Sequence, residues 1–156
     1  MATVEVTGNV VYPTCNINGL KDIPSGLTQT VDLGQYTAKD ILDGTTKSVP
    51  IPLVINCSSG PNINGVSLSF SHLGSYPPVG SYPGAIRTNL RNIAVLLKWK
   101  IDNSEVEFFN IAKVFKNNGD NIYDASMVAK IVPYTSINNI EKGRLKSGIK
   151  VIMSYI

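Results

Sequence analysis

Histidine and cysteine side chains supply nucleophiles, bases and metal ligands, and this chain has only three of them. His72 is the only histidine among 156 residues. This excludes a metal site built on imidazoles, and a Ser-His-Asp triad would have to use this one side chain. His72 continues the alternating run that reaches Phe70, a position that favours an inert, exposed histidine at a strand end. Cys15 and Cys57 are too few for a zinc site built on cysteine alone and lack CxxC spacing.

Carboxylates are the other candidates for catalysis. Asp40 and Asp43 could share a helical face, and Glu105 and Glu107 share a strand face. Either pair has the residue types that glycoside hydrolysis uses. Most acidic residues of the chain stand at strand ends and turns, where aspartate commonly bonds to nearby backbone. The glycines of segment 74–84 are spaced among prolines and open no helix, so they form no phosphate-binding loop. The sequence therefore predicts no enzyme activity, no metal and no cofactor.

The charge pattern argues against nucleic acid or a membrane surface as a partner. The net charge is only +3, and charged residues make up 16% of the chain. The basic residues are spread along the sequence rather than clustered. No apolar stretch approaches the length of a transmembrane helix. Trp99, flanked by Lys98 and Lys100, suits a core anchor better than a platform for stacking a sugar ring.

The two cysteines favour a disulfide, with two buried free thiols as the alternative. Cys15 and Cys57 each stand at the end of an apolar, strand-like run. A bridge across a loop of this length would stabilise the fold by roughly 3–4 kcal/mol in the chain-entropy model. It would also require an oxidising compartment such as the periplasm or the cell surface. Met1 is followed directly by Ala2 without a signal peptide, and a start codon in place of a removed signal would account for this.

Strand-like segments dominate a chain of single-domain length. They are separated by turn signals at intervals of roughly 8–15 residues, which predicts an all-β sandwich. Only residues 37–43 suit a helical turn, and residues 73–85 form the one candidate long loop, rich in Gly, Pro and Tyr. The expected strands are residues 2–12, 27–33, 49–57, 66–70, 93–99, 105–109, 111–115, 127–134 and 148–156.

The first of these segments alternates over eleven residues. This period-two pattern is typical of a half-buried strand about 35 Å long. Polar residues occupy one face, and the other face carries Ala2, Val4, Val6, Gly8 and Val10. A terminal strand of this kind can pair with its own sheet or with another molecule.

The end of the chain has a matching apolar face. Ile149, Val151, Met153 and Tyr155 alternate with polar and opposite-facing residues, and Gly143 stands fourteenth from the end. Taken alone, this pattern predicts an ordinary C-terminal edge strand.

Together, the two ends and the segments between them resemble the pilin subunits of chaperone–usher fimbriae, especially the minor, adaptor-type subunits of type 1 and P pili. The matching features, in chain order, are Gly8 seven residues before Cys15, the Cys15/Cys57 pair, the segment TVDLG at 30–34, the apolar strand into Cys57, an Ala129-centred strand, Gly143 and the penultimate Tyr155. Two features depart from the family pattern: the apolar last residue Ile156 and the Asn/Ile-rich segment 135–140.

The resemblance implies an immunoglobulin-like sandwich that lacks its final strand and is completed by a donor strand from another chain. Residues 1–12 would be an N-terminal donor-strand extension outside the chain's own core, and residues 13–156 the pilin domain. A missing strand leaves a hydrophobic groove and unpaired backbone groups, and a strand added from outside repairs both defects. The donor side chains would be Ala2, Val4, Val6, Gly8 and Val10, and the acceptor groove and chaperone-binding residues would be Val151, Met153, Tyr155 and Ile156.

The same resemblance implies the partners and the location. A periplasmic pilus chaperone would supply the missing strand first, and the extension of a neighbouring fimbrial subunit would then replace it at the outer-membrane usher. The protein would be a structural subunit of a fimbrium on the bacterial cell surface, reached through the periplasm, and would serve cell adhesion.

Two alternatives remain at this point. The chain could be a pilin that also binds a receptor through the loop at 73–87, where Tyr76 and Tyr82 suit contact with carbohydrate or protein. It could instead be a stand-alone secreted carbohydrate-binding β-sandwich, which would be a stable monomer when expressed alone.

Overall fold

The computed structural model describes residues 2–9, 15–19, 27–60, 62–73, 76–108, 111–135 and 143–156. In the described part, one short helix, α1 (Ala38–Leu42), accompanies strands β1 (Ala2–Asn9), β2 (Asn16–Ile17), β3 (Leu27–Gly34), β4 (Val49–Ile51), β5 (Val54–Asn56), β6 (Gly65–His72), β7 (Ala85–Arg87), β8 (Ile93–Trp99), β9 (Lys113–Lys116), β10 (Ile122–Asp124), β11 (Met127–Pro133) and β12 (Leu145–Tyr155). The predicted all-β sandwich and the helical turn are both confirmed.

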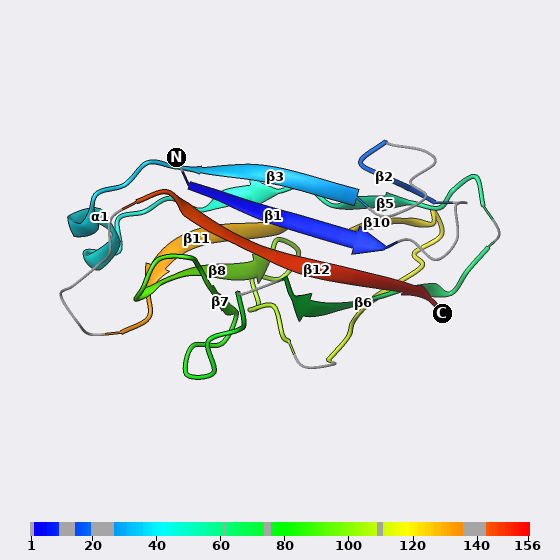
Figure 1. The fold of residues 1–156 in the computed structure, drawn as a ribbon. Coiled ribbons are helices and arrows are strands. Elements are labelled where there is room, and N and C mark those ends of the chain that lie inside the picture. The colour runs from blue at the N-terminus through cyan, green and yellow to red at the C-terminus, as the bar shows by residue number, and fades with distance from the viewer. Residues whose placement is uncertain are drawn as a thin grey trace.

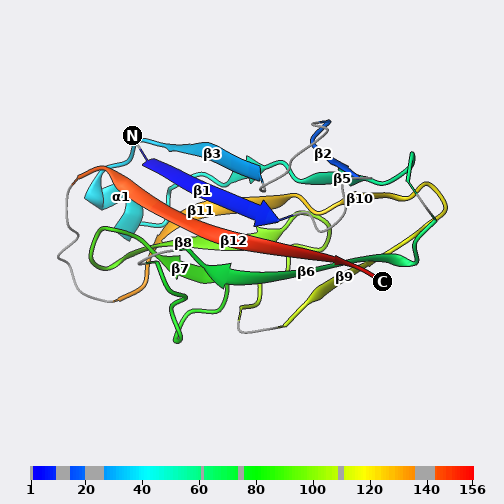
Figure 2. The ribbon, with the colours of Figure 1, turned by 45° about the vertical axis from the view of Figure 1, so that its right-hand side comes forward.

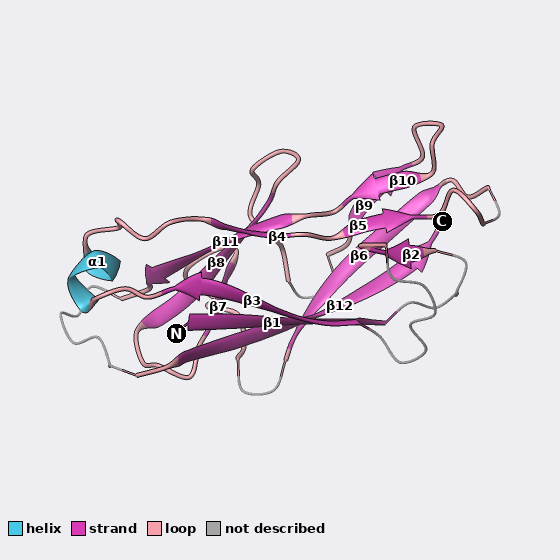
Figure 3. Cartoon of the chain, turned by 90° about the horizontal axis from the view of Figure 1, so that it is seen from above, coloured by secondary structure: helices cyan, strands magenta, loops and turns pink. Residues whose placement is uncertain are grey.

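The strands form three sheets around one core. A five-stranded sheet has the order β3-β1-β12-β6-β9, and it faces a four-stranded sheet of order β4-β11-β8-β7 and a three-stranded sheet of order β10-β5-β2. Figure 3 shows these layers from above, with α1 at the same end of the sandwich as the N-terminus. Side chains from all three sheets belong to one buried cluster, including Val31 and Ile149, Val95 and Leu97, and Ile55.

Proline explains why the predicted strand at 49–57 is divided in two. Pro52 has no backbone N–H to donate to a ladder, and it lies between β4 and β5. The next N–H, that of Leu53, donates to the Ser126 hydroxyl at 3.0 Å instead of a neighbouring strand. The break lets one chain segment cross from the four-stranded to the three-stranded sheet.

The strand predicted at 105–109 is wrong for its described residues. Val106 and Phe108 are buried and alternate as expected, but the only ladder contact there is an isolated bridge between Glu105 and Lys98. The three-residue strands β7 and β10 were not predicted. β7 lies at the end of the Gly- and Pro-rich segment, where the local composition favours a loop.

The position of β1 differs from the sequence expectation. Residues 2–9 do not extend away from the fold: β1 lies inside the five-stranded sheet, between β3 and β12 (Figures 1 and 2). Ala2, Val4 and Val6 belong to the main buried cluster. The alternation predicted the strand and its buried face correctly. It did not predict that the sheet completed by this strand would be the chain's own.

The predicted disulfide is confirmed. Cys15 and Cys57 are bonded, with their Cα atoms 4.2 Å apart, and neither cysteine is free. The Tyr155 hydroxyl donates to Cys15 Sγ at 3.0 Å. The beginning of β2, the end of β5 and the end of β12 are therefore held together at one end of the sandwich.

Candidate strand-exchange site

The residues that β1 covers form the acceptor groove, which we define as the strip of core between β3 and β12. β1 runs parallel to β12, with Ala2 opposite Leu145 and Asn9 opposite Ile152. It runs antiparallel to β3, with Val4 opposite Val31. Figure 1 shows the arrow of β1 and the end of β12 pointing the same way. Both backbone edges of this strand are paired along the groove.

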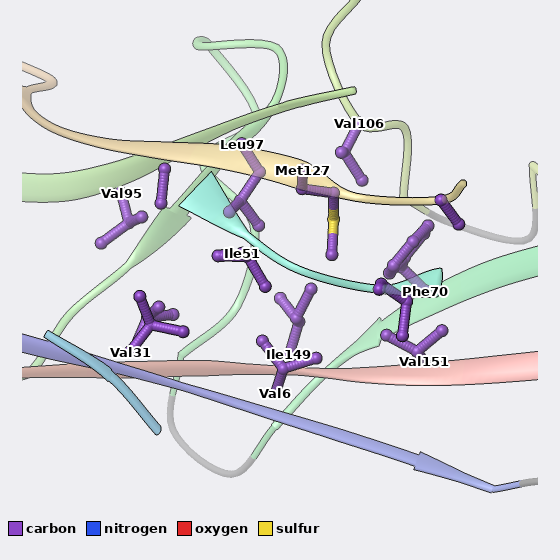
Figure 4. Packing of buried hydrophobic residues seen from close by; sticks show 14 of the residues in the cluster. Val6, Val31, Ile51, Phe70, Val95, Leu97, Val106, Met127, Ile149 and Val151 are labelled. Carbon is purple, nitrogen blue, oxygen red and sulfur yellow. The ribbon is translucent and has the colours of Figure 1, made fainter. Parts of the chain in front are cut away.

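The inward face of β1 is small and apolar, as the alternation predicted. The side chains of Ala2, Val4 and Val6 are 7%, 0% and 4% exposed, while Glu5 on the outward face is exposed. In Figure 4, Val6 lies beside Ile149 on the groove side of the core. Burial of a valine side chain stabilises a fold by about 1.5–3 kcal/mol. Alternate apolar side chains and main-chain pairing together therefore hold β1.

A glycine in β12 lets β1 approach closely. Gly148 lies opposite Glu5, and a Cβ at this position would stand 2.7 Å from the Glu5 carbonyl oxygen and 2.7 Å from Leu73 Cδ2. Side chains do not tolerate such a distance to backbone. Gly148 is thus a groove residue that the sequence analysis missed. A glycine inside an apolar strand pattern, which often marks a close backbone approach, was the available signal.

A pocket of about 580 Å³ adjoins the groove where β1 and β12 begin. Its wall is mostly apolar, and Ala2 is the residue through which β1 contributes to it. The pocket lining includes Tyr36, Ile41, Leu90, Ile131 and Leu145. α1 holds part of this wall through a capping box, in which the Thr37 hydroxyl accepts from the Asp40 N–H and the Asp40 carboxylate accepts from the Thr37 N–H, both at 3.1 Å. The bond from the Thr37 N–H is the main cause of the lowered pKa of the Asp40 carboxyl group.

The other end of the groove reaches beyond β1. Val151 and Met153 are 5% and 3% exposed, and Ile156 is 49% exposed. Tyr155 is half-buried. Within the described residues, Met153 to Tyr155 pair with β6 on one side only. Val10, the last of the predicted donor side chains, lies outside the described residues, and Gly8 lies opposite Val151.

Tyr76 and Tyr82, the two candidate receptor-binding residues, are both anchored to the fold. The Tyr82 N–H donates to the Val79 carbonyl at 3.1 Å, and the Tyr82 ring packs against a second buried cluster, which consists of Val79, Ala85, Ala94 and Val132. Tyr76 is half-buried, and its N–H donates to the Leu73 carbonyl at 3.3 Å. Tyr82 is therefore partly committed to packing on the outer face of the four-stranded sheet.

The candidates for chemistry do not come together as a site. Trp99 is 2% exposed, so it is the core anchor that the sequence predicted. Asp40 is engaged in its capping box, and Glu105 and Glu107 are exposed. Among the described residues, no group of three or more His, Cys, Asp or Glu side chains could hold a metal ion. No helix in the described part is long and apolar enough to cross a membrane.

Asp102, in the turn after β8, has a carboxyl group whose pKa is strongly perturbed, and it lies outside the groove. The Lys113 ammonium donates to Asp102 Oδ2 at 2.6 Å, and the Ser104 hydroxyl and N–H donate to Asp102 Oδ1. These bonds hold the pKa of Asp102 well below its usual range. Lys113 Nζ also lies 6.0 Å from the centre of the Trp99 ring. This ion pair fastens the turn after β8 to the edge strand β9.

Comparisons with known proteins agree with this architecture. A family model described as fimbrial protein matches residues 4–155. The chain is similar to the P pilus rod subunit PapA, with 16% identity over 92% of this chain and 99% of that chain and a TM-score of 0.62. It is also similar to a chain from a chaperone–usher pilus whose structure concerns rod uncoiling, with 17% identity over 96% and 91% of the two chains and a TM-score of 0.68. No curated protein sequence matches.

These structural likenesses confirm the predicted pilin-type sandwich, and the family match accounts for nearly the whole chain. The chain belongs to the fimbrial protein family and is a structural subunit of a fimbria on the bacterial cell surface.

Proposed function

We propose that this fimbrial subunit assembles by the chaperone–usher route, exchanging donor strands with its neighbours. Residues 1–12 are the donor-strand extension, and residues 13–156 are the pilin domain that accepts a strand. A periplasmic chaperone covers the acceptor groove first, and at the outer-membrane usher the extension of a neighbouring subunit replaces the chaperone. The donor side chains are those predicted from the sequence: Ala2, Val4, Val6, Gly8 and Val10.

The observation that carries this proposal is the way the acceptor groove holds a strand. β1 is bound by backbone pairing on both edges and by burial of every second side chain from Ala2 to Val6. Recognition of this kind depends on alternation and main-chain hydrogen bonds, as in other cases of β-strand addition. It does not depend on covalent connection to the groove. A strand of the same pattern from another molecule can therefore use the same contacts.

The end of β12 supports a chaperone contact at the predicted residues. Val151 and Met153 face the core, and Tyr155 and Ile156 continue past the last residue paired with β1. Ile156 exposes 49% of its surface. An apolar strand edge of this kind favours aggregation unless another strand covers it. A chaperone strand is the cover that we propose.

A peptide-exchange assay tests the proposal. The chain is purified with its fimbrial chaperone and mixed with a fluorescent peptide of residues 2–12. We expect the peptide to displace the chaperone and remain bound during gel filtration. A Gly8→Leu peptide should bind about tenfold or more weakly, because added volume in a packed interior typically costs 1–3 kcal/mol. A Thr7→Leu peptide should bind like the parent, because the strand period turns residue 7 outward.

The paired peptides decide the outcome. Equal binding by the Gly8→Leu and Thr7→Leu peptides would show that residues 2–12 do not enter the groove with the proposed face, and failure of the parent peptide to bind would reject donor-strand exchange. The adaptor-type position and the absence of enzyme activity stay predictions from the sequence. Receptor binding through Tyr76 and Tyr82 is not proposed, because the Tyr82 ring packs against a buried cluster.

A further inference from the structure

We infer that the free chain closes its own acceptor groove with residues 2–9, forming a monomer that must release β1 before a neighbour's strand can enter. This inference rests on the proposed function for its consequence but not for its geometry. The geometry is the pairing of β1 with β12 over Ala2–Asn9 and with β3 over Ala2–Gly8. The groove and the segment that fills it therefore belong to the same molecule.

The segment between Asn9 and Cys15, which we call the tether, is so short that it allows this closure in one direction only. Asn9 and Cys15 are six residues apart, and a fully extended chain spans at most about 3.3–3.6 Å per residue, or about 20 Å in all. Cys15 is fixed near the end of β12 by its disulfide and by the Tyr155 hydroxyl. In the parallel arrangement Asn9 lies opposite Ile152, about 10 Å along the strand from Tyr155. The tether reaches this position easily.

The antiparallel arrangement is out of reach for the chain's own strand. Reversing β1 in the groove would bring Asn9 to the beginning of β12 at Leu145. β12 spans eleven residues, so this point lies about 33 Å from Tyr155. A tether of about 20 Å cannot cover that distance. A strand from a second molecule has no such tether, so it can enter in either direction.

The closed arrangement also leaves an end of the groove poorly filled. The parallel direction places the small Ala2 side chain at the 580 Å³ pocket. An antiparallel strand from another molecule, with the same face inward, would bring its opposite end and a larger valine toward this pocket. Reversal exchanges the two ladders, making the pairing with β12 antiparallel and the pairing with β3 parallel, so filling of the pocket is the difference that favours the second molecule's strand. The closed monomer is therefore a resting state that a second molecule's strand can displace.

Proximity keeps the resting state populated at low concentration. A short linker holds the segment beside its groove at an effective concentration in the millimolar range, above that of free neighbours. A stable monomer of this protein is consequently compatible with a fimbrial role. Stability of the isolated monomer does not by itself separate a pilin from a stand-alone binding module.

Cysteine pairs across β1 and β12 test the closure directly. Thr3 lies opposite Lys146, and Thr7 lies opposite Lys150. Neighbouring strands lie about 4.8 Å apart, within the range of about 4.4–6.8 Å between Cα atoms that a disulfide requires. The variants T3C/K146C and T7C/K150C of the full chain are oxidised gently at low concentration, and mass spectrometry of unreduced peptides identifies the links. We expect both pairs to cross-link within the monomer.

The matched control uses the same residues in the wrong register. In T3C/K150C the second cysteine is four residues along β12, about 13 Å from the first pairing position, which is beyond disulfide reach. We expect its intrachain link to form at least about tenfold more slowly than the T3C/K146C link, because the native sheet must open first. An excess of the 2–12 peptide should slow the intrachain links, because it competes for the groove.

The outcomes separate this inference from the proposed function. Links within the monomer that the peptide slows support both. Links within the monomer that no concentration of peptide slows support self-closure and count against donor-strand exchange. Peptide binding without intrachain links in either matched pair, or equal cross-linking by the control, overturns self-closure and leaves the donor role standing.

Discussion

β1 and β8 both carry fully buried side chains but are attached to the fold in different ways. Val4 in β1 and Leu97 in β8 are both fully buried. β8 is paired along its length with β11 and pairs on its other edge with β7. The chain continues on both sides of β8 into strands of the same sandwich. β1 precedes the disulfide, and only the short segment between Asn9 and Cys15 connects it to the core strands that follow. Burial indicates how much a strand contributes to the stability of the fold, whereas chain connectivity decides whether the strand can leave without unfolding its neighbours.

The largest expected effect is at the groove end of β12. Met153→Lys would place a charge in the core, at a cost of several kcal/mol unless the ammonium reaches water, because Met153 is 3% exposed. We expect the recovered complex with the fimbrial chaperone to be lost. The control is Ile152→Lys, one residue away on the outer face, where the side chain is 38% exposed. A wild-type yield of the Met153→Lys complex would argue against the assignment of this residue to the groove.

The disulfide probes the part of the fold that follows β1 and that we expect to stay in place during strand exchange. Its two cysteines are 42 residues apart in sequence, and the chain-entropy model gives about 4 kcal/mol for a loop of this size. We expect a double Cys15→Ala, Cys57→Ala variant to unfold at a much lower urea concentration than the parent. Titration of the unfolded, unreduced parent should find no free thiol. Two free thiols per chain, or an unchanged urea midpoint in the variant, would disagree with this account.

A substitution at Gly148 tests the docking of β1, the strand that we expect to exchange. The Ala side chain of Gly148→Ala would press on the Glu5 backbone, and we expect β1 to dock more weakly by about 1–3 kcal/mol. Gly80→Ala is the matched control, because a Cβ there meets nothing within 4 Å. Proteolysis after residue 9 should speed up in Gly148→Ala and stay unchanged in Gly80→Ala. Equal rates in the two variants would mean that Gly148 does not control the seating of β1.

The smallest expected effect is on the way acid lowers the stability of the fold, and it comes from the Asp102–Lys113 ion pair. Because bonding to Lys113 lowers the pKa of Asp102 in the folded state, the stabilisation by this pair is fully present above the unfolded-state pKa of about 3.9. It is lost as the pH falls through the lower folded-state pKa. Asp102→Asn should therefore lower the urea midpoint slightly at neutral pH and flatten its decline in acid. Identical acid profiles for Asp102→Asn and the parent would show that the Asp102–Lys113 pair does not stabilise the fold.

The sequence predicts the strands better than it predicts their partners. Alternation identifies β1 and its buried face, since Ala2, Val4 and Val6 all lie inward. The same alternation suits the chain's own groove and a neighbour's groove equally well. Only the position of Cys15 relative to the end of β12 shows which directions the tether allows, and that distance exists only in the folded chain.

The missed elements have local causes. β7 and β10 have three residues each, too few for a periodic pattern, and their pairing is set by the neighbouring strands. Val106 and Phe108 alternate because they both pack into the core, which imitates a strand without forming a ladder. Gly148 was missed as a groove residue because close backbone approach depends on the strand that lies opposite.

Native-state hydrogen exchange in low urea tests the central claim most directly, since it reports on β1 and β11 in the same molecule. The account predicts that the β1 amides from Thr3 to Thr7 exchange through a local opening, with a lower free energy and a weaker urea dependence than the β11 amides from Val128 to Val132. The β11 amides should exchange only through global unfolding. Equal free energies and equal urea dependence for the two strands would contradict the claim that β1 is an exchangeable strand.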